Sequence, residues 1–405
     1  MRKTAIIGGG AAGCFMAIRL KELVPDMEVV VFEKQNKLLA KVEITGGGRC
    51  NCTNSFEGVT DLSQVYPRGA RLLKRLFRQF DHEDAYRWFE DHGVRLVTQE
   101  DHCVFPAAQD SHVIMECLTS EMRRLGVKVR LGIDGFSAID GFDFVAITTG
   151  GMSRGSVSRY SSGAVIPPLP SLFTLNIADK YLTSLMGTVA DNAIVSVPGT
   201  KIRTQGPLLI THWGMSGPAI LKLSSHAARL LAEHDYKMPL AVNWTGESNM
   251  EEVRESVAHI VNTQGQKLIG NVRPCGLSSR LWDYLVGKSG LDVSSKRWNE
   301  VGKKQMNRLL EIMTNDQYVS AGRCHYKEEF VTCGGISLDS IDKNTLEAKA
   351  PILLCQTKEE SSERIFPRIF LAGEVLDIDG VTGGFNLQAA WTTAFAAAEG
   401  IAKCV

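Results

Sequence analysis

The first 35 residues alternate between strand-like and helix-like patterns. Residues 4–7 form a short β-type run, and a glycine-rich stretch, GGGAAG, follows it. Ala17, Leu20 and Val24 recur at helical spacing, which predicts a helix over 11–24 that ends at Pro25. Residues 28–33 read EVVVFE, the composition of a fully buried strand. This order predicts a βαβ unit with a parallel sheet.

The same alternation continues along the chain. Apolar spacing predicts one helix over 71–92 and a second over 111–125, for which Asp110 is the expected N-cap. We expect strands at 104–106, 127–131 and 144–151, and a last strand at 369–374. An alanine-rich helix from about Leu387 to Ala402 ends the chain.

The middle of the chain has a different pattern. Three prolines between 167 and 170 mark a boundary, after which β-type runs continue to Trp244 and helical spacing dominates from 250 to 318. The expected fold class is α/β, a Rossmann-type domain with an inserted β-barrel-like domain and a small helical domain. The predicted boundaries are 1–165 with 353–405, 166–248 with 328–352, and 249–327.

Composition narrows the functional classes. The chain has 405 residues, 45 basic and 45 acidic, and 44% hydrophobic residues, which excludes a disordered, collagen-like or coiled-coil protein. The charge balance and the lack of a continuous basic run predict no nucleic-acid or membrane partner. Ten cysteines without CxxC or zinc spacing predict reduced thiols, no metal site and a cytoplasmic location.

The glycine-rich stretch fits GxGxxG at Gly8, Gly10 and Gly13. The first glycine permits a tight turn, the second lets backbone amides approach a pyrophosphate, and the third allows close helix–strand packing. Glu33 ends the second strand, where a carboxylate binds the hydroxyls of an adenosine ribose. These features predict an adenine dinucleotide, and a 2′-phosphate at this first site is disfavoured.

Two further segments favour FAD over NAD. The last strand ends in Gly373 and Glu374, and the following helix is expected to direct its N-terminus at the flavin, where negative charge develops on reduction. Gly46 to Gly48 leave bare backbone that can pass close to a planar ring.

Three motifs together resemble a known family: TGGGRCNCTN, ITHWGMSGPAIL and GEVLDIDGVTGGFNLQAAWTTAF. They resemble the NAD(P)/FAD-dependent oxidoreductase flavoproteins that include aminoacetone-oxidase-like and bile-acid-reducing members. The resemblance covers nearly the whole chain and implies a tightly held FAD, but no single substrate. The segments 132–143 and 153–162 are shorter than is usual in that family, which puts the rim of the adenine site in doubt.

The motifs and the resemblance together assign the candidate residues. Those expected to bind the cofactor are Gly8, Gly10, Ala12, Gly13, Glu33, Lys34, Arg49, Cys50, Asn51, Thr149, Gly150, Gly373, Glu374, Gly384, Phe385 and Asn386. Thr45, Gly46 and His212 are candidates for positions near the flavin, although a histidine satisfied inside a β domain is the commoner case. Cys50 and Cys52 have poor spacing for a redox disulfide. Catalytic residues and oligomeric state are left unassigned.

The expected function is hydride transfer between flavin N5 and a small organic substrate or a nicotinamide. NADH or NADPH would bind only transiently, because no second GxGxxG with a following acid occurs after residue 150. The alternatives are a flavin-dependent tRNA-modifying enzyme and a non-catalytic FAD-binding redox sensor.

Overall fold

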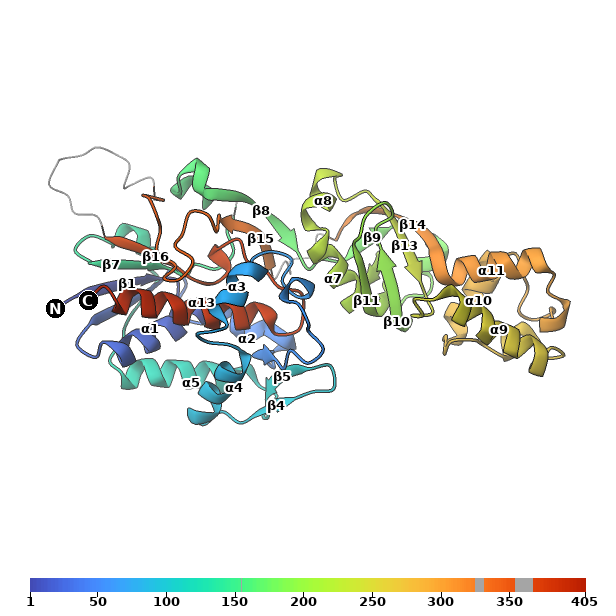
Figure 1. The fold of residues 1–405 in the computed structure, drawn as a ribbon, viewed down its shortest axis with the longest axis horizontal. Helices are drawn as coiled ribbons and strands as arrows, with labels where there is room; N and C mark the ends of the chain where they lie inside the picture. Colours follow the sequence, from blue (N-terminus) through green and yellow to red (C-terminus); the bar gives the residue numbers. More distant parts are fainter. Residues whose placement is uncertain (154, 325–330, 354–366) are drawn as a thin grey trace. The chain divides into compact units, whose positions relative to one another are not determined.

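The computed structural model describes residues 1–153, 155–324, 331–353 and 367–405 (Figure 1). The chain forms two compact units: unit 1 comprises Met1–Leu169 and Val331–Val405, and unit 2 comprises Pro170–Phe330. Each unit has its own hydrophobic core. The first and last parts of the sequence therefore fold together, and the middle forms a separate body.

Unit 1 is built on a five-stranded parallel sheet with the order β16-β7-β1-β2-β6. The strands are β1 (Lys3–Ile7), β2 (Glu28–Glu33), β6 (Lys128–Leu131), β7 (Phe144–Ile147) and β16 (Arg368–Leu371). The central strands carry continuous apolar runs because helices and loops cover both of their faces. The predicted α/β fold class is confirmed.

The first and last helices of the chain lie side by side in unit 1 (Figure 1). They are α1 (Ala11–Leu23) and α13 (Phe385–Ala402). Small side chains on both helices allow this close approach, and the Arg19 guanidinium lies 2.8 Å from a carboxylate oxygen of Glu399 across the pair. The third long helix, α5 (Ser111–Arg124), begins where expected, with Asp110 accepting from the His112 amide at 2.9 Å.

The single helix expected over 71–92 was wrong. The structure has two helices, α3 (Ala70–Leu76) and α4 (His82–Asp91). α3 ends at Leu76, and Asp81 starts a new helix because its side chain accepts from the backbone amides of Glu83 and Asp84 and so caps α4. Apolar spacing alone did not reveal this cap.

Three small elements complete unit 1. A short helix, α2 (Ala40–Ile44), follows the second strand of the large sheet. A three-stranded sheet has the order β3-β5-β4, with bounds Thr53–Asn54, Cys103–Pro106 and Leu96–Thr98. A two-stranded sheet joins β15 (Val331–Ile336) to β8 (Val165–Ser171), whose residues up to Leu169 belong to unit 1.

The observed division differs from the predicted boundaries at two points: the first segment of unit 1 ends at Leu169 and not at residue 165, and unit 1 resumes earlier than residue 353. We expected 328–352 to return to the β-rich domain, but the chain from Val331 onward belongs to unit 1. The reason is that β15 pairs with β8, and its Gly335 lies against the backbone of Val375. The predicted boundary between 327 and 328 lies outside the described residues.

Unit 2 contains a closed six-stranded barrel with the order β10-β11-β12-β9-β14-β13. Its strands are β9 (Leu175–Ile177), β10 (Val189–Ser196), β11 (Arg203–Ile210), β12 (Gly214–Ser216), β13 (Pro239–Asn243) and β14 (Asp316–Arg323). Its short helices are α6 (Lys180–Thr183), α7 (Pro218–His226) and α8 (Ala228–Glu233). The helical insertion between β13 and β14 comprises α9 (Met250–Gln264), α10 (Ser279–Lys288) and α11 (Lys303–Asn315).

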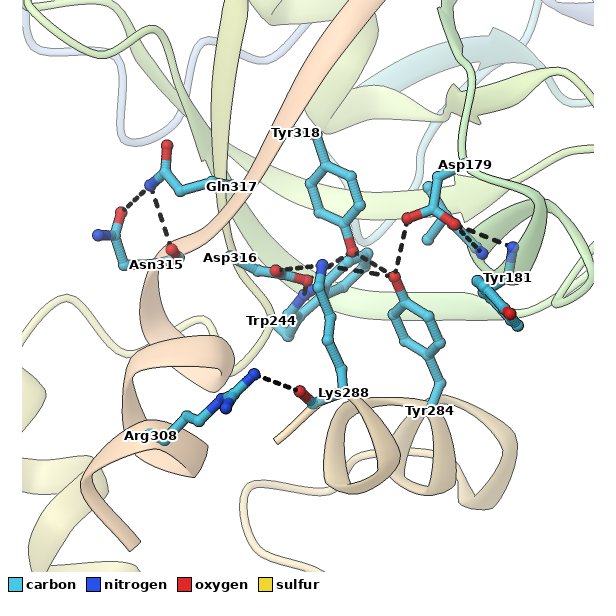
Figure 2. A network of polar contacts seen from close by, with 11 residues as sticks. Asp179, Tyr181, Trp244, Tyr284, Lys288, Arg308, Asn315, Asp316, Gln317 and Tyr318 are labelled. Atoms are coloured by element: carbon cyan, nitrogen blue, oxygen red, sulfur yellow. Dashed lines mark hydrogen bonds and ion pairs between the residues drawn. The ribbon is translucent and has the colours of Figure 1, made fainter. Parts of the chain in front are cut away.

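A polar network joins this helical insertion to the barrel (Figure 2). The Asp316 carboxylate is almost fully buried and pairs with the Lys288 ammonium of α10 at 2.5 Å. It also accepts from the Trp244 indole at 3.1 Å and from the Tyr318 hydroxyl. Burial raises the pKa of Tyr318 well above its usual value. The lysine thus compensates a buried carboxylate and ties the insertion to the barrel.

Within the described ranges, the structure has no helix with the length and apolar character needed to cross a membrane.

Candidate functional site

The glycine-rich turn after β1 is closely packed at two of its three motif positions. Gly8 has φ +111°, and a Cβ atom there would lie 2.5 Å from the Thr148 carbonyl oxygen. A Cβ atom on Gly13 would lie 1.9 Å from the carbonyl oxygen of Gly8. No larger side chain fits at either position, so α1 begins directly against β1 and the end of β7.

Gly10 is different because its backbone faces open space. A Cβ atom there would have no heavy atom within 4 Å, and Gly10 has ordinary extended dihedrals, with φ −84°. Among the described residues, none caps the start of α1 with a side chain. The backbone amides at this helix N-terminus are therefore available to an anionic group.

Glu33 lies beside this turn, at the end of β2. One carboxylate oxygen accepts from the Gly9 amide at 2.8 Å and the other from the Gln35 amide at 2.9 Å. The carboxylate is thus held next to the helix N-terminus, where an adenosine ribose is expected. Lys34 follows it and is exposed to solvent.

Ala12 brings the two ends of the sequence together. A Cβ atom on Gly373, which has φ +79°, would lie 2.9 Å from the Ala12 Cβ. Gly373 also donates its amide to the Thr393 hydroxyl of α13 at 2.9 Å. The last strand therefore ends directly against the start of the first helix.

Glu374 is held by two partners from distant parts of the chain. One carboxylate oxygen lies 2.8 Å from the Lys41 ammonium, and the other accepts from the Thr332 amide at 2.8 Å. Gly150 is close by, because a Cβ atom on it would lie 3.7 Å from Glu374 Oε2. Thr149, before Gly150, is exposed.

The TGGG segment is a left-handed turn. Gly46, Gly47 and Gly48 all have φ between 57° and 86°, a region that favours glycine. The Arg49 guanidinium donates to the Gly46 carbonyl at 3.0 Å and lies 4.3 Å from the centre of the Phe105 ring. In this structure, the Arg49 side chain thus stabilises the TGGG turn through contacts within the protein.

Thr45 and Cys50 close the TGGG turn from its two ends. The Cys50 amide donates to the Thr45 carbonyl at 3.0 Å, and its side chain is fully buried. Burial raises the pKa of the Cys50 thiol to about 12 and that of Cys52 well above its usual value. Both are free thiols, so the structure contains no Cys50–Cys52 disulfide.

Asn51 links this turn to the start of α13. Its side-chain amide donates to the Thr53 carbonyl at 3.0 Å and accepts from the Gly384 amide at 3.1 Å. Gly384 has φ +87°, and a Cβ atom there would lie 2.2 Å from the Thr53 carbonyl oxygen. Phe385 begins the helix, and its carbonyl accepts from the Tyr66 hydroxyl at 2.8 Å.

The Asn386 side chain is directed back at the loop before α13 and stabilises that loop. Its side chain accepts from the Gly380 amide at 2.8 Å and donates to the Gly380 carbonyl at 2.9 Å. This closed loop sets where the N-terminus of α13 begins.

Three residues of the site were missed by the sequence analysis. Thr148 donates to the Gly8 carbonyl at 2.8 Å, and Lys41 and Thr332 hold Glu374. Thr148 follows its strand directly and could have been noticed there. Lys41 and Thr332 carry no local signal, because their partner is far away in the sequence.

His212 belongs to unit 2, where it is exposed in the turn between β11 and β12. Its ring centre lies 4.2 Å from that of Trp213. Its proximity to a flavin stays a prediction. In the described part of the chain, no group of three or more His, Cys, Asp or Glu side chains is arranged to hold a metal ion.

Comparison with known proteins decides the family. A family model described as "HI0933-like protein Rossmann domain" matches residues 2–400. The chain belongs to the HI0933-like family. This is an FAD-binding oxidoreductase family, in agreement with the resemblance found in the sequence motifs.

The HI0933-like chain is similar to three curated proteins over nearly its whole length. It is 24% identical to a 3-dehydro-bile acid delta(4,6)-reductase of Clostridium scindens, covering 100% of both chains. It is 26% identical to a ribosomal RNA dihydrouridine synthase of Haemophilus influenzae, covering 98% of both. The corresponding Escherichia coli protein is 26% identical, with 97% of this chain and 96% of that one covered.

Among solved structures, the HI0933-like chain is similar to a 3-ketosteroid delta1-dehydrogenase from Sterolibacterium denitrificans. The identity is 11%, both chains are covered completely, and the TM-score is 0.45.

The described residues fit an FAD-type dinucleotide. The open backbone at Gly10 is a cradle that a side chain would fill, and the start of α1 supplies uncompensated amides beside it. The start of α13 lies against the Asn51 segment within the same unit.

Proposed function

We propose that this protein is an FAD-dependent reductase that adds hydrogen across a carbon–carbon double bond conjugated to a carbonyl group. NADH or NADPH is the proposed electron donor, bound transiently. The observation that carries the proposal is the open backbone at Gly10 beside Glu33, at the start of a helix that begins against Gly373. It supports a dinucleotide held between the two ends of the sequence.

The chain's own residues would bind and orient the cofactor. The amides at the start of α1 would bind the diphosphate, and Glu33 would accept hydrogen bonds from the adenosine ribose. Glu374 would accept from the ribityl hydroxyls, and the start of α13 would lie near the flavin ring. When bound, FAD supplies a two-electron hydride donor and acceptor.

The buried thiols exclude one competing chemistry. Cys50 and Cys52 are fully buried, and their raised pKa values keep them protonated at neutral pH. A thiolate that attacks a substrate or a flavin is therefore not part of the proposal. Electrons would pass from the nicotinamide to the organic substrate through the cofactor alone.

The substrate class comes from the chemistry shared by the named relatives. A delta(4,6)-reductase of a 3-dehydro bile acid reduces double bonds next to an oxo group, and a dihydrouridine synthase adds two hydrogens to a uracil ring. In both compounds the alkene is conjugated to a carbonyl. Hydride addition at the β-carbon and proton addition at the α-carbon complete such a reduction.

The test is an anaerobic reduction followed by an oxidation. The flavin-loaded protein is reduced with NADH or NADPH and then mixed with a steroid 4,6-dien-3-one, a uridine oligonucleotide or an unconjugated alkene as control. We expect a conjugated compound to restore the oxidised flavin spectrum and to gain two hydrogens by mass spectrometry. If the flavin is reoxidised only after air is admitted, and no conjugated compound is reduced, the result would instead support the redox-sensor alternative.

A further inference from the structure

An exposed basic face occurs on α3 and the turn after it. Its four members are Arg71, Lys74, Arg75 and Arg78, and all four are exposed. Their spacing is i, i+3, i+4 and i+7, which places them on one side of the helix. The opposite side is apolar and buried, with Leu72, Leu73 and Leu76 in the core of unit 1. We call these four cations the α3 basic face.

The α3 basic face forms no ion pair within 4 Å in the described chain, although hydrogen bonds from Ser63 and, to a lesser extent, the nearby Lys74 lower the pKa of the Asp61 carboxyl. Within the described ranges, none of its four side chains forms an ion pair or a hydrogen bond. Cations on neighbouring helices behave differently, since Arg87 pairs with Asp84 at 2.7 Å and Arg124 with Glu121 at 2.7 Å. A chain with 45 basic and 45 acidic residues thus concentrates a positive stripe at one place.

The α3 basic face is anchored to the flavin end of the candidate site. Arg68, just before α3, forms a buried ion pair with Asp379. A Cβ atom on Gly69 would lie 2.6 Å from Ile378, and Tyr66 donates to the carbonyl of Phe385. The helix also packs against α13 (Figure 1). A ligand on the α3 basic face would therefore lie beside the segment that leads into α13.

The shape of the α3 basic face favours a polymer over a single anion. Three of the cations lie on α3 and Arg78 lies in the turn after it, so the four are spread along eight residues, about 10 Å at the helical rise of about 1.5 Å per residue. A single phosphate is better held by side chains that converge on one point. The large exposed apolar side chains that membrane binding requires are also absent from 71–79, a fully described segment. A row of phosphates matches both the extended line of cations and the lack of exposed apolar side chains around them.

We propose that the α3 basic face is a docking surface for the phosphate backbone of RNA. The inference rests on the proposed function, because it names the molecule that carries the conjugated carbonyl: a uracil ring within an RNA. Two relatives of 26% identity are ribosomal RNA dihydrouridine synthases, which agrees with this occupant. The cations are interrupted by apolar residues in the sequence, so a continuous basic run never appears there.

The test measures RNA binding as a function of salt, with matched charge variants. The flavin-loaded protein is titrated into a labelled, structured, uridine-containing RNA. The variant Arg71→Gln/Arg75→Gln removes two cations from the α3 basic face. The control Arg123→Gln/Arg130→Gln removes two exposed cations from α5 and β6, and it changes the net charge equally. Arg75 and Arg123 also both lie in the last turn of a helix.

We expect the wild type and the control to bind alike. For the α3 variant, the slope of log affinity against log salt should fall by about 1.4–1.8, since two phosphate contacts are lost at about 0.7–0.9 each. Its affinity at about 0.15 M salt should drop at least tenfold. Equal losses in both variants, or no salt-dependent binding by the wild type, would overturn the inference.

Two further measurements distinguish RNA docking from membrane binding and from a loss of flavin. Vesicles of phosphatidylserine and phosphatidylcholine are offered to the same proteins, and binding to them that depends on Arg71 and Arg75 in place of RNA binding would reassign the surface to a membrane. Flavin content and flavin reduction are measured on the same samples. Intact flavin chemistry without RNA binding refutes this inference alone, whereas RNA binding without flavin refutes the proposed function alone.

Discussion

The guanidinium of Arg68 and the carboxylate of Asp379 form an ion pair between segments 311 residues apart in the sequence. The side chain of Arg68 is 9% exposed and that of Asp379 is fully buried. The pair fixes the loop before α13 to the start of α3, so it holds the two ends of the chain in one body.

Replacing Arg68 with methionine should destabilise the protein by about 3–5 kcal/mol, because a buried carboxylate loses its compensating charge. Urea unfolding measures the change. Arg87→Met is the control: that arginine also pairs with an aspartate, but its side chain is 68% exposed, and about 1 kcal/mol or less is expected. Equal losses of unfolding free energy in the two variants would mean that the buried Arg68–Asp379 pair stabilises the protein no more than an exposed pair does.

Gly10 and Gly13 should respond in opposite ways to a larger side chain. Gly10→Val should fold with a loss of about 1 kcal/mol or less, because valine is a poorer N-cap for α1, and it should lose FAD, since the new side chain has space in the protein but occupies the diphosphate position. Gly13→Ala should lose about 1–3 kcal/mol or more, because its Cβ collides with the Gly8 carbonyl. Urea unfolding of the apoproteins and FAD titration separate the two effects. Stoichiometric FAD in Gly10→Val would refute the assigned diphosphate site.

The Cys50 thiol should make stability depend on pH in the alkaline range. Its pKa is raised to about 12 in the folded protein, against about 8.5 in an unfolded chain. A raised pKa means that the stabilising contribution is complete below the unfolded value and is lost as the pH rises toward the folded value. Each such thiol lowers the free energy of unfolding by about 1.4 kcal/mol per pH unit within that window.

Cys50→Ala should therefore flatten the decline in the free energy of unfolding between about pH 9 and pH 11. The lost packing only shifts the whole curve, since it does not depend on pH. Val42→Ala, which removes buried volume without a titrating group, should shift the curve and keep its slope. An unchanged slope in Cys50→Ala would contradict the raised pKa.

Glu374 and Lys41 should contribute unequally to cofactor binding. If the Glu374 carboxylate accepts hydrogen bonds from the ribityl chain, Glu374→Ala should raise the FAD Kd about tenfold or more. Lys41→Ala should change it by about threefold or less, because the lysine side chain is 61% exposed and its ion pair is screened by solvent. Titration of apoprotein with FAD gives both values. An equal loss of FAD affinity in the two variants would mean that the Lys41–Glu374 ion pair, and not a contact of Glu374 with FAD, supports cofactor binding.

Local features could be predicted because each depends on residues close together in the sequence. The strand–glycine–helix order of the first 35 residues, the N-cap at Asp110 and the last strand and helix all appear where expected. A glycine conformation, a helix cap and an apolar period are set by neighbouring residues. The N-cap at Asp81, which starts α4, is also local, but the apolar spacing on both sides concealed it.

The candidate site could be predicted only as a set of separate segments. The contacts of Ala12 with Gly373, of Lys41 with Glu374 and of Asn51 with Gly384 join residues more than 300 positions apart. Nothing in the residues around each partner encodes these contacts, because they arise when the sheet and its covering helices pack.

The sequence by itself thus determined the Rossmann-type fold and the chemistry offered by each motif. The tertiary structure alone decided which motifs meet, and it left the α3 basic face exposed while burying the apolar side of that helix. The physical reason is range: dihedral preferences and hydrophobic periods act over a few residues, whereas packing brings together parts of the chain that have no local relationship.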